Sequence, residues 1–397
     1  MENIISTIKT LSSQYFEEIL EIRRHIHANP ELSFEEFETS KYICSQLDKM
    51  GVPYKNGYVK TGIVAHIKGS NPDKKVVALR ADFDALPITE ENELEYKSCN
   101  NGVMHACGHD VHTSCLLGAA KILNELKTEF EGTVKLVFQP GEEKLPGGAS
   151  LMIKENALKN PDADKIIAQH VFPDLEVGKV GYRSGMYMAS ADEIYVTIKG
   201  KGGHAALPHK FIDPILISSH MVVALQQIVS RHTKPDIPVV LSFGKIEGNG
   251  ATNVIPEEVK LEGTFRCMNE ETRFDLHAKM KKMADAIAEG MGGSIDFNIQ
   301  VGYPFLTNDE NTTFKAKQAA ELYLGKENVV DLDLRMTAED FAYYSQIIPG
   351  CFYRLGTANK AKGITSGLHT STFNVDEKSL EIGMGLMAWS AINELYS

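Results

Sequence analysis

Residues 105–112, HACGHDVH, hold three histidines, one cysteine and one aspartate. Nitrogen, sulfur and oxygen donors at this density indicate either a metal site or an unusual piece of surface. Imidazole suits zinc, nickel and cobalt, and a thiolate suits a borderline-soft ion. Cys107 and His109 are two residues apart, so they can reach one ion from an irregular loop but not from one face of a helix. His112 falls on the first turn of the following helix, where we expect it to support or pack against the site.

More donors follow three apolar runs of the chain. They are Asp82 and Asp84 after VVAL, Glu142 and Glu143 after TVKLVFQP, and His170 after KIIAQ, with His369 on a loop before the last helix. In an open α/β sheet, ligands bind outside the carboxyl ends of the strands. Any one of these residues alone would more often have an ordinary structural role. Together, at one edge of one sheet, they predict a functional site.

The segments that must position these residues alternate between helical and strand patterns. Helical patterns cover YFEEILEIRRHIHANP, SFEEFETSKYICSQLDKMG and DVHTSCLLGAAKILNEL, and the apolar runs are KVVALRAD, TVKLVFQP and KIIAQHV. Pro30 and Gly51 mark helix ends, and Ser33 followed by Glu36 has the form of a helix cap. We interpret His25 and His27 as surface or interdomain contacts. The alternation predicts an α/β domain with a mostly parallel central sheet.

The middle of the chain predicts a different unit. Strand patterns in DEIYVTIKGKG, PVVLSFGKIEG, EVKLEGTFRCM and SIDFNIQV are interrupted by helical patterns in DPILISSHMVVALQQIVS and TRFDLHAKMKKMADAIAEGMG. The order is β-α-β-β-α-β, which forms a small sheet with both helices on one face. We place this insert at residues 187–300. Residues 1–186 and 301–397 then form one discontinuous domain.

The composition narrows the class of protein. The 397 residues carry a net charge of −12, which argues against a nucleic-acid partner because phosphates need a basic face. No window approaches the run of about 18 apolar residues that spans a membrane, and the N-terminus has the pattern of an amphipathic helix instead of a secretion signal. The six cysteines are scattered without a C-x-x-C pair, which is typical of reduced thiols. We predict a cytoplasmic protein.

Short motifs along nearly the whole chain carry a family resemblance. In this order they are RADFDALP, MHACGHDVHTS, FQPGEE followed by GGA, GKGGHAALPH, TNVIPEEV, GTFR, TAEDFAYY and LHTSTFNVDE. As a set they resemble the M20 metallopeptidase family, and within it the branch of N-acyl-L-amino acid amidohydrolases. That branch includes hippurate hydrolases, aminoacylases and hydrolases of auxin conjugates. The resemblance implies a metal-binding α/β domain interrupted by a small lid domain that is used in dimerisation.

The resemblance also implies a centre of two divalent metal ions per subunit, with zinc, manganese, nickel or cobalt as the metal. Its ligands would be Cys107, which would bridge the ions as a thiolate, and His109, Glu143, His170 and His369. Asp82 would support these ligands without binding metal. Many family members carry H-x-D where this chain has Arg80-Ala81-Asp82, and an aspartate in place of Cys107. This departure points to the amidohydrolase branch.

The catalytic roles are implied in the same way. Glu142 would be the general base and acid. Successive residues of an extended chain point in opposite directions, so one glutamate can bind metal while its neighbour faces the attacking water. His204 on the lid would reach the substrate carbonyl, in this family often from the partner subunit. Asn253 and Arg266 on the lid would hold the substrate carboxylate.

The expected reaction is hydrolysis of the amide bond of an N-acyl-L-amino acid, such as an N-acetyl or N-benzoyl compound. The products would be a carboxylate and a free amino acid, and the enzyme would be a homodimer joined through the lid. One alternative is a metallo-dipeptidase or carboxypeptidase of the same family. Another is a metal-stabilised regulatory protein without activity. Structural zinc sites are usually closed tetrahedra without a base beside them, so Glu142 argues against this last alternative.

Overall fold

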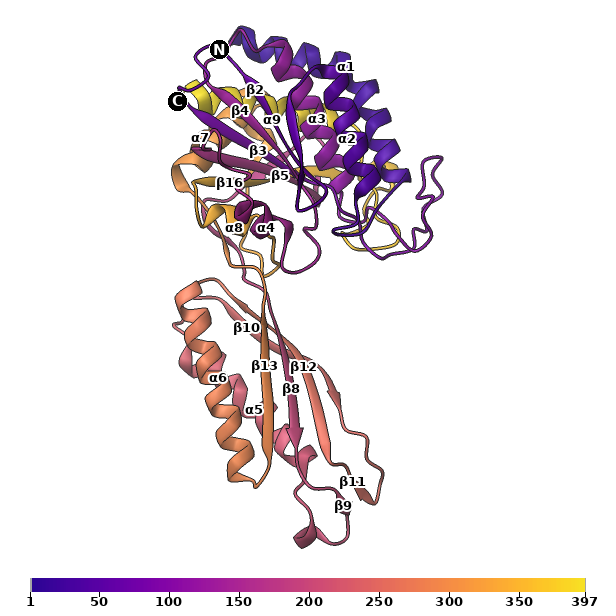
Figure 1. Ribbon diagram of the computed structural model, residues 1–397, viewed down its shortest axis with the longest axis vertical. Helices are drawn as coiled ribbons and strands as arrows, with labels where there is room; N and C mark the ends of the chain where they lie inside the picture. The colour runs from indigo at the N-terminus through magenta and orange to yellow at the C-terminus, as the bar shows by residue number, and fades with distance from the viewer. Residues whose placement is uncertain (1, 397) are drawn as a thin grey trace. The chain divides into compact units, whose positions relative to one another are not determined.

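The computed structural model describes residues 2–396, which fold into two compact units (Figure 1). The first comprises Met1–Gly185, Thr307–Asp333 and Asp340–Ser397, and the second comprises Met186–Leu306 and Leu334–Glu339. The second unit thus covers the insert predicted at 187–300, extends past it to Leu306, and takes one further short segment. Within residues 2–396, no helix combines the length and apolar character needed to cross a membrane.

The first unit is built on an eight-stranded sheet with the order β1-β2-β4-β3-β5-β16-β6-β15. Its strands are β1 (Tyr54–Tyr58), β2 (Gly62–Lys68), β3 (Val76–Asp82), β4 (Thr133–Gln139), β5 (Lys165–Glu176), β6 (Val180–Tyr182), β15 (Val329–Asp331) and β16 (Gly350–Ala358). The central strands β4, β3, β5 and β16 run parallel to one another. Antiparallel pairings join β1 to β2, β2 to β4 and β6 to β16. The predicted α/β class with a mostly parallel sheet is confirmed.

Strand β3 shows how the sequence places charged side chains at the edge of this sheet. All seven of its residues are buried, as expected for a strand covered on both faces. Val77, Leu79 and Ala81 belong to the main hydrophobic core. Because side chains alternate along a strand, Arg80 and Asp82 point to the opposite face. A strand that is apolar on one face therefore carries two charged groups at its carboxyl end.

Helices cover both faces of the sheet (Figure 1). One group packs together over the main core and consists of α1 (Glu2–Ala28), α2 (Phe37–Met50), α3 (His109–Glu125), α7 (Glu310–Leu324) and α9 (Ser379–Tyr396). On the other face, α4 (Gly148–Lys154) contacts α8 (Ala342–Ser345). Short 3-10 helices cover Lys326–Asn328 and Lys360–Lys362. Helix α3 runs back from the site edge through the core, so its first residues lie at the carboxyl ends of the strands.

The sequence signals for the helix ends are only partly correct. Helix α1 ends at Ala28, before Pro30, and Gly51 adopts a φ of 64° as the C-cap of α2. The predicted cap at Ser33 is wrong, since α2 begins at Phe37. The Ser33 hydroxyl instead donates to Asp84 Oδ2 at 2.6 Å. The hydroxyl thus donates to a buried carboxylate, and hydrogen bonds to charged groups are the stronger ones.

The second unit has the predicted β-α-β-β-α-β order along the chain. Its main elements are β8 (Asp192–Lys199), α5 (Pro214–His232), β10 (Val239–Glu247), β12 (Glu258–Cys267), α6 (Glu270–Gly290) and β13 (Ser294–Val301). The four strands form an antiparallel sheet in the order β10-β12-β8-β13. Both helices share one hydrophobic core with one face of this sheet. The alternating burial of β8, with Ile194, Val196 and Ile198 inside, is the pattern of a strand with one solvated face.

Smaller elements complete the second unit and the links to it. The short strands β9 (Gly203–His204) and β11 (Val254–Ile255) pair antiparallel at one end of the four-stranded sheet (Figure 1). A 3-10 helix covers Pro208–Lys210. Strands β7 (Gly185–Met188) and β14 (Leu306–Asn308) lie where the chain passes from one unit to the other.

Candidate metal centre

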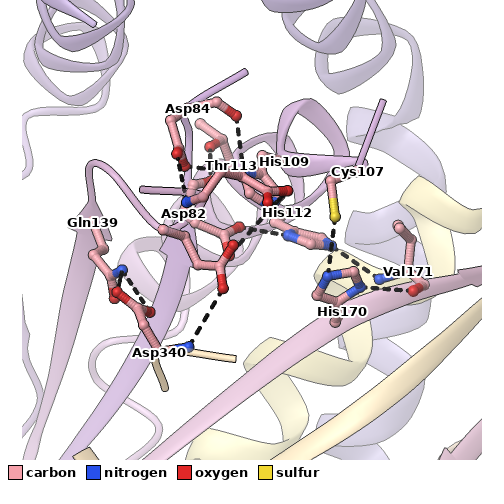
Figure 2. Close-up of polar contacts among 12 residues, drawn as sticks. Asp82, Asp84, Cys107, His109, His112, Thr113, Gln139, His170, Val171 and Asp340 are labelled. Carbon is pink, nitrogen blue, oxygen red and sulfur yellow. Dashed lines mark hydrogen bonds and ion pairs between the residues drawn. The ribbon is translucent and has the colours of Figure 1, made fainter. Parts of the chain in front are cut away.

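The donors predicted from the strand ends lie together at the carboxyl edge of the central sheet (Figure 2). Cys107 Sγ lies 3.5 Å from His170 Nε2 and 3.3 Å from His369 Nε2. Glu143 Oε1 lies 3.2 Å from His369 Nε2 and 3.9 Å from His109 Nε2. The structure therefore brings together all five residues that the resemblance marked as metal ligands.

Three overlapping sets of donors in this cluster could each hold one ion. They are Cys107, His109 and His170; Cys107, Glu143 and His369; and His109, Glu142 and Glu143. Within each set the donor atoms lie within 4.8 Å of one another. Cys107, His109 and Glu143 each belong to two of these sets. The overlap fits a centre of two ions held by neighbouring ligands.

The unsatisfied polar atoms of the cluster support the same conclusion. Among the described residues, His109 Nε2 and Glu143 Oε1 are buried without a hydrogen-bond partner, which costs free energy unless something else binds them. Burial raises the pKa of the Cys107 thiol well above its usual value, and the charges of Glu143 and Glu142 raise it further. Divalent cations at this point would pair the orphaned atoms and favour the thiolate. The donor set thus fits the metal ions that the resemblance implies.

Hydrogen bonds fix the ring orientation of two of the histidines. His109 Nδ1 lies 2.9 Å from the Asp84 carbonyl oxygen and 3.1 Å from Asp84 Oδ1, both of which are acceptors. His170 Nδ1 lies 2.7 Å from the Val171 carbonyl oxygen. Each Nδ1 must therefore carry the proton, and each Nε2 keeps its lone pair for the centre. Support of this kind is typical of histidines that bind metal.

His369 is held in an unusual backbone conformation. Its φ is 60°, in the left-handed region that residues other than glycine seldom occupy. Its backbone N–H donates to the Ala106 carbonyl oxygen at 2.8 Å, next to Cys107. Such conformations persist where the surroundings fix them, often at functional sites. The loop that carries His369 is thus tied to the loop that carries Cys107.

On the second unit, the structure places His204 beside Asn253. His204 pairs with Val254 across the β9–β11 ladder, and Ala205 N donates to the Asn253 carbonyl oxygen at 3.0 Å. Both residues line a groove of about 770 Å³. His204 Nδ1 accepts a hydrogen bond from Ala206 N at 3.1 Å. In the neutral ring, Nε2 therefore carries the proton and can donate it to a ligand.

The structure does not bring Arg266 to this groove. Arg266 lies near the carboxyl end of β12, opposite Val240, whereas the groove is lined by Glu258 and Lys260 at the other end of that strand. Eight residues of extended strand from 258 to 266 span about 26 Å. Burial lowers the pKa of Arg266. The structure therefore does not place Arg266 with Asn253 around one carboxylate.

Comparison with known proteins now identifies the family. Residues 78–391 match the family model described as Peptidase family M20/M25/M40. This chain belongs to that family. It is 41% identical to the IAA-amino acid hydrolase ILR1-like 4 of Arabidopsis thaliana, over 100% of this chain and 90% of the relative. It is also 41% identical to the N-acetyl-L-cysteine deacetylase of Bacillus subtilis, over 94% of this chain and 86% of the relative.

A solved structure shows the same fold. It is the Bacillus subtilis YXEP protein, described as a dinuclear metal binding peptidase from the M20 family, which is 34% identical to this chain. The two structures superpose with a TM-score of 0.83 over 97% of this chain and 99% of the other. The two-ion fit of the donor cluster agrees with that description.

Arg80 stands where many M20 peptidases have a histidine, and it has no place among the donor sets. Its guanidinium donates to Asp82 Oδ2 at 2.6 Å and to Asp340 Oδ1 at 2.8 Å. His112 Nδ1 lies 2.5 Å from Asp82 Oδ1, and its Nε2 accepts from Val171 N at 2.9 Å. Burial alone would raise the pKa of Asp82, but the charge of Arg80 and the neighbouring imidazoles hold it well below its usual value. His112 therefore supports the site, as predicted.

Asp340, in the motif TAEDFAYY, is a residue for which the sequence suggested no role. Its backbone N–H donates to Glu142 Oε1 at 3.4 Å. Its carboxylate accepts from Arg80 and from Gln139 Nε2 at 2.9 Å, and from Ala149 N at 2.9 Å. Glu142 itself is only 6% exposed. The carboxyl group next to the candidate metal ligands is thus held by a buried polar network.

Proposed function

We propose that this protein hydrolyses the amide bond of N-acyl-L-amino acids, releasing a carboxylate and a free amino acid. The observation that carries the proposal is the buried carboxylate of Glu142 beside five metal-ligand side chains. Its donor atoms lie within 4.8 Å of those of His109 and Glu143. A closed structural metal site needs no such neighbour. The names of the two curated relatives, an IAA-amino acid hydrolase and an N-acetyl-L-cysteine deacetylase, support this substrate class.

Two divalent ions would be held by the cluster, with Cys107 between them. The remaining ligands are His109, Glu143, His170 and His369, and zinc, manganese, nickel and cobalt all suit this set. When bound, the ions supply Lewis acidity, which lowers the pKa of a water molecule and polarises the amide carbonyl. Asp82 and Asp84 do not bind metal in this proposal, because their hydrogen bonds are already made to histidines.

Glu142 would move the proton. It takes a proton from the attacking water and later delivers it to the amine that leaves. Positioned acid–base groups of this kind contribute roughly 10²–10⁴-fold in rate. The Asp340 N–H at 3.4 Å from Glu142 Oε1 helps to hold the carboxylate in place. Glu143, the next residue, faces the ligand His369 instead.

His204, Asn253 and Arg266 would bind the substrate from the lid. The hydrogen bond from Ala206 N to His204 Nδ1 leaves the Nε2–H free to donate to the carbonyl oxygen, where negative charge develops. The guanidinium of Arg266 suits the α-carboxylate. The Asn253 side chain can donate to the same class of group.

We further propose a homodimer joined through the lid and a cytoplasmic location. The lid sheet has two outer strands, β10 and β13, and exposed strand edges are usually protected. The free cysteines among the described residues suit a reducing compartment.

Turnover of defined amides tests the function. The protein is stripped with a chelator and reloaded with zinc, manganese, cobalt or nickel, and release of free amino acid is then measured. We expect hydrolysis of N-acetyl- or N-benzoyl-L-amino acids and much weaker activity on their α-amides. Preference for dipeptides would favour the alternative dipeptidase or carboxypeptidase activity. No turnover of any amide by the fully loaded protein would contradict an enzymatic function.

A further inference from the structure

In the segment Ser33–Glu36, between α1 and α2, the side chains of Ser33 and Glu36 point into the protein. Glu36 is fully buried and Ser33 is 8% exposed. Glu36 Oε1 accepts from Gly141 N at 2.9 Å and from Phe34 N at 2.8 Å, and Glu36 Oε2 accepts from the Thr61 hydroxyl at 3.0 Å. Neither Ser33 nor Glu36 makes a side-chain cap bond to α2. Glu36 is instead bonded to the loop that follows β4, through Gly141, and Ser33 to Asp84 after β3.

These bonds reach both sides of Glu142. The Gly141 N–H, one residue before Glu142, is held by Glu36. The Glu143 N–H, one residue after, donates to Asp84 Oδ2 at 2.9 Å, and this oxygen also accepts from Ser33. The Gly141 N–H belongs to the peptide unit 140–141 and the Glu143 N–H to the unit 142–143, so the two bonds together limit the backbone rotations of Gly141 and Glu142. The direction of the Glu142 side chain is thereby set from segment 33–36.

Segment 33–36 and the loop after β4 are in close contact at Phe34 and Gly141. Phe34 has a φ of 68° and Gly141 a φ of 62°, and the left-handed region is rare for an aromatic residue. A Cβ placed on Gly141 would lie 2.4 Å from Phe34 Cε1. The loop and the segment therefore approach as closely as a glycine allows. Strained conformations persist where surrounding bonds fix them.

We propose that Glu36, assisted by Ser33, is a positioning residue that holds the loop Pro140–Glu143 so that the Glu142 carboxylate meets the reacting water. This inference rests on the proposed role of Glu142 as the base. A methionine at position 36 would leave two buried N–H groups unpaired, and the loop would move to satisfy them. A glutamine keeps one oxygen for both donors and can turn its amide NH₂ to the Thr61 hydroxyl, which also accepts.

Three variants test the inference. Glu36→Met is expected to lower kcat on an N-acyl-amino acid by about 10- to 100-fold, since small displacements of a reacting group have effects of this size. Glu36→Gln is expected to stay within about threefold of the parent, because its bonds are kept. Glu35→Met places the same side chain at the exposed neighbour and is the matched control, with unchanged kcat.

Hydrogen exchange at Gly141 tests the structural step without any activity. Its amide should exchange faster in Glu36→Met and remain protected in Glu36→Gln and Glu35→Met. Unchanged protection in Glu36→Met would overturn the inference even if kcat falls. A parent protein that turns over no N-acyl-amino acid would contradict the proposed function alone, since the exchange result stands apart from it.

A double-mutant cycle separates positioning from a general loss of folded enzyme. If Glu36 acts through Glu142, then Glu36→Met lowers kcat in the parent but leaves the residual kcat of Glu142→Gln unchanged. Equal fold losses in both backgrounds would overturn the inference. If Glu36→Met does not fold, Ser33→Ala takes its place in the same cycle, with a smaller expected loss of roughly threefold.

Discussion

At the scale of single residues, two adjacent glutamates of the candidate metal centre have different surroundings. Glu143 Oε1 lies 3.2 Å from His369 Nε2 and, within residues 2–396, has no hydrogen-bond partner. Glu142 Oε1 instead accepts a hydrogen bond from Asp340 N. One carboxylate is thus left open to a cation, and the other is held by a backbone donor. The pair lies in the bend that follows β4, after Gly141 with its φ of 62°, and not in the extended chain that the sequence suggested.

We predict that Glu142→Gln keeps both metal ions and loses at least about 100-fold in kcat, because an amide cannot accept a proton from water. Glu143→Gln should instead lose metal, because a neutral amide is a weaker ligand for a divalent ion than a carboxylate. Metal analysis after gel filtration, with single-turnover kinetics, measures both effects. If Glu142→Gln loses metal and Glu143→Gln stays loaded but inactive, the two roles are exchanged.

At the scale of elements, the start of α3 positions Cys107 and His109. Gly108 lies between these ligands as the N-cap of α3, with a φ of 82°. A Cβ at Gly108 would lie 2.4 Å from Val171 Cγ2. Val171 follows the ligand His170 in β5 and donates its N–H to His112. A side chain at position 108 would therefore push α3 away from the strand that carries a third ligand.

Gly108→Ala is predicted to weaken metal binding by at least about tenfold, because an overpacked contact forces the backbone to shift. Gly102→Ala is the matched control. Gly102 has a φ of 80° but open space around its Cα, so the variant has the same backbone strain without the collision. Competition with a chelator measures affinity, and thermal unfolding measures stability. Equal losses of affinity in both variants would show that strain alone, and not packing on Val171, controls the centre.

In the lid, one buried carboxylate joins α6 to β8. Asp192 accepts from Arg273 Nε at 2.8 Å and lies 2.8 Å from His277 Nε2. Burial alone would raise the pKa of Asp192, but the bonds and charges of Arg273 and His277 lower it. A carboxyl group with a depressed folded pKa stabilises the fold above its unfolded pKa and loses this contribution as the pH falls through its folded pKa. Arg266 adds a further positive charge nearby.

We predict that Asp192→Asn destabilises the lid by about 3 kcal/mol at neutral pH, the typical cost of breaking a buried ion pair. The difference from the parent should be constant from about pH 5.5 to 8 and shrink below about pH 4. Hydrogen exchange of the backbone amides in β8 and α6 measures this difference in the free energy of unfolding. The single tryptophan, Trp389 in α9, reports on the first unit and should be unaffected. A difference that grows toward low pH would contradict the assignment.

That the candidate ligands lie together could be predicted from the sequence, because most of them follow a strand end or begin a helix, and α/β topology brings such positions together. The residues that hold these side chains in place could not be predicted, because their contacts join segments that are far apart in the sequence. Asp340 and Arg80 are 260 residues apart. His27, expected as a surface or interdomain contact, is instead fully buried and lies 2.8 Å from Asp110 Oδ2, 83 residues away. Amphipathic periodicity can indicate that a side chain is buried, but it gives no information about which residue that side chain contacts.

The resemblance supplied the residues of the lid but not their arrangement. Asn253 and Arg266 were assigned to one substrate carboxylate, yet Asn253 lies in the groove at the Glu258 end of β12 and Arg266 lies about 26 Å along that strand from Glu258. They are only 13 residues apart in the sequence, which suggests that they are close in space. The extended strand β12 instead keeps them far apart. The same geometry separates Arg266 from His204, which pairs with Val254.

At the scale of the whole molecule, this separation favours a shared active site in a dimer. An N-acyl-amino acid is about two to three residues long, or roughly 10 Å. It cannot contact His204 and Arg266 of the same lid if they are more than about 20 Å apart. In a symmetric dimer, each site could take Arg266 from one subunit and His204 with Asn253 from the other. We therefore expect His204 to act on the substrate bound by the partner subunit.

Complementation between two inactive variants tests this expectation. His204→Ala should keep its metal and lose about 10²–10³-fold in kcat, the usual cost of removing an oxyanion donor, and Glu142→Gln lacks the base. If His204 acts on the partner's substrate, a mixed dimer has one site with both groups intact. Random mixing then restores about a quarter of the parental activity, since half of the dimers are mixed and each has one working site.

If His204 acts within its own subunit, neither site of a mixed dimer has both groups, and mixing restores nothing. The control is His204→Ala mixed with a double variant that carries both His204→Ala and Glu142→Gln. It forms the same dimers without an intact His204 and should stay inactive under either arrangement. Sedimentation at micromolar concentration establishes the dimer first. A 43.9 kDa monomer under assay conditions would contradict both the dimer and the shared site, because His204 and Arg266 could then not act on one substrate.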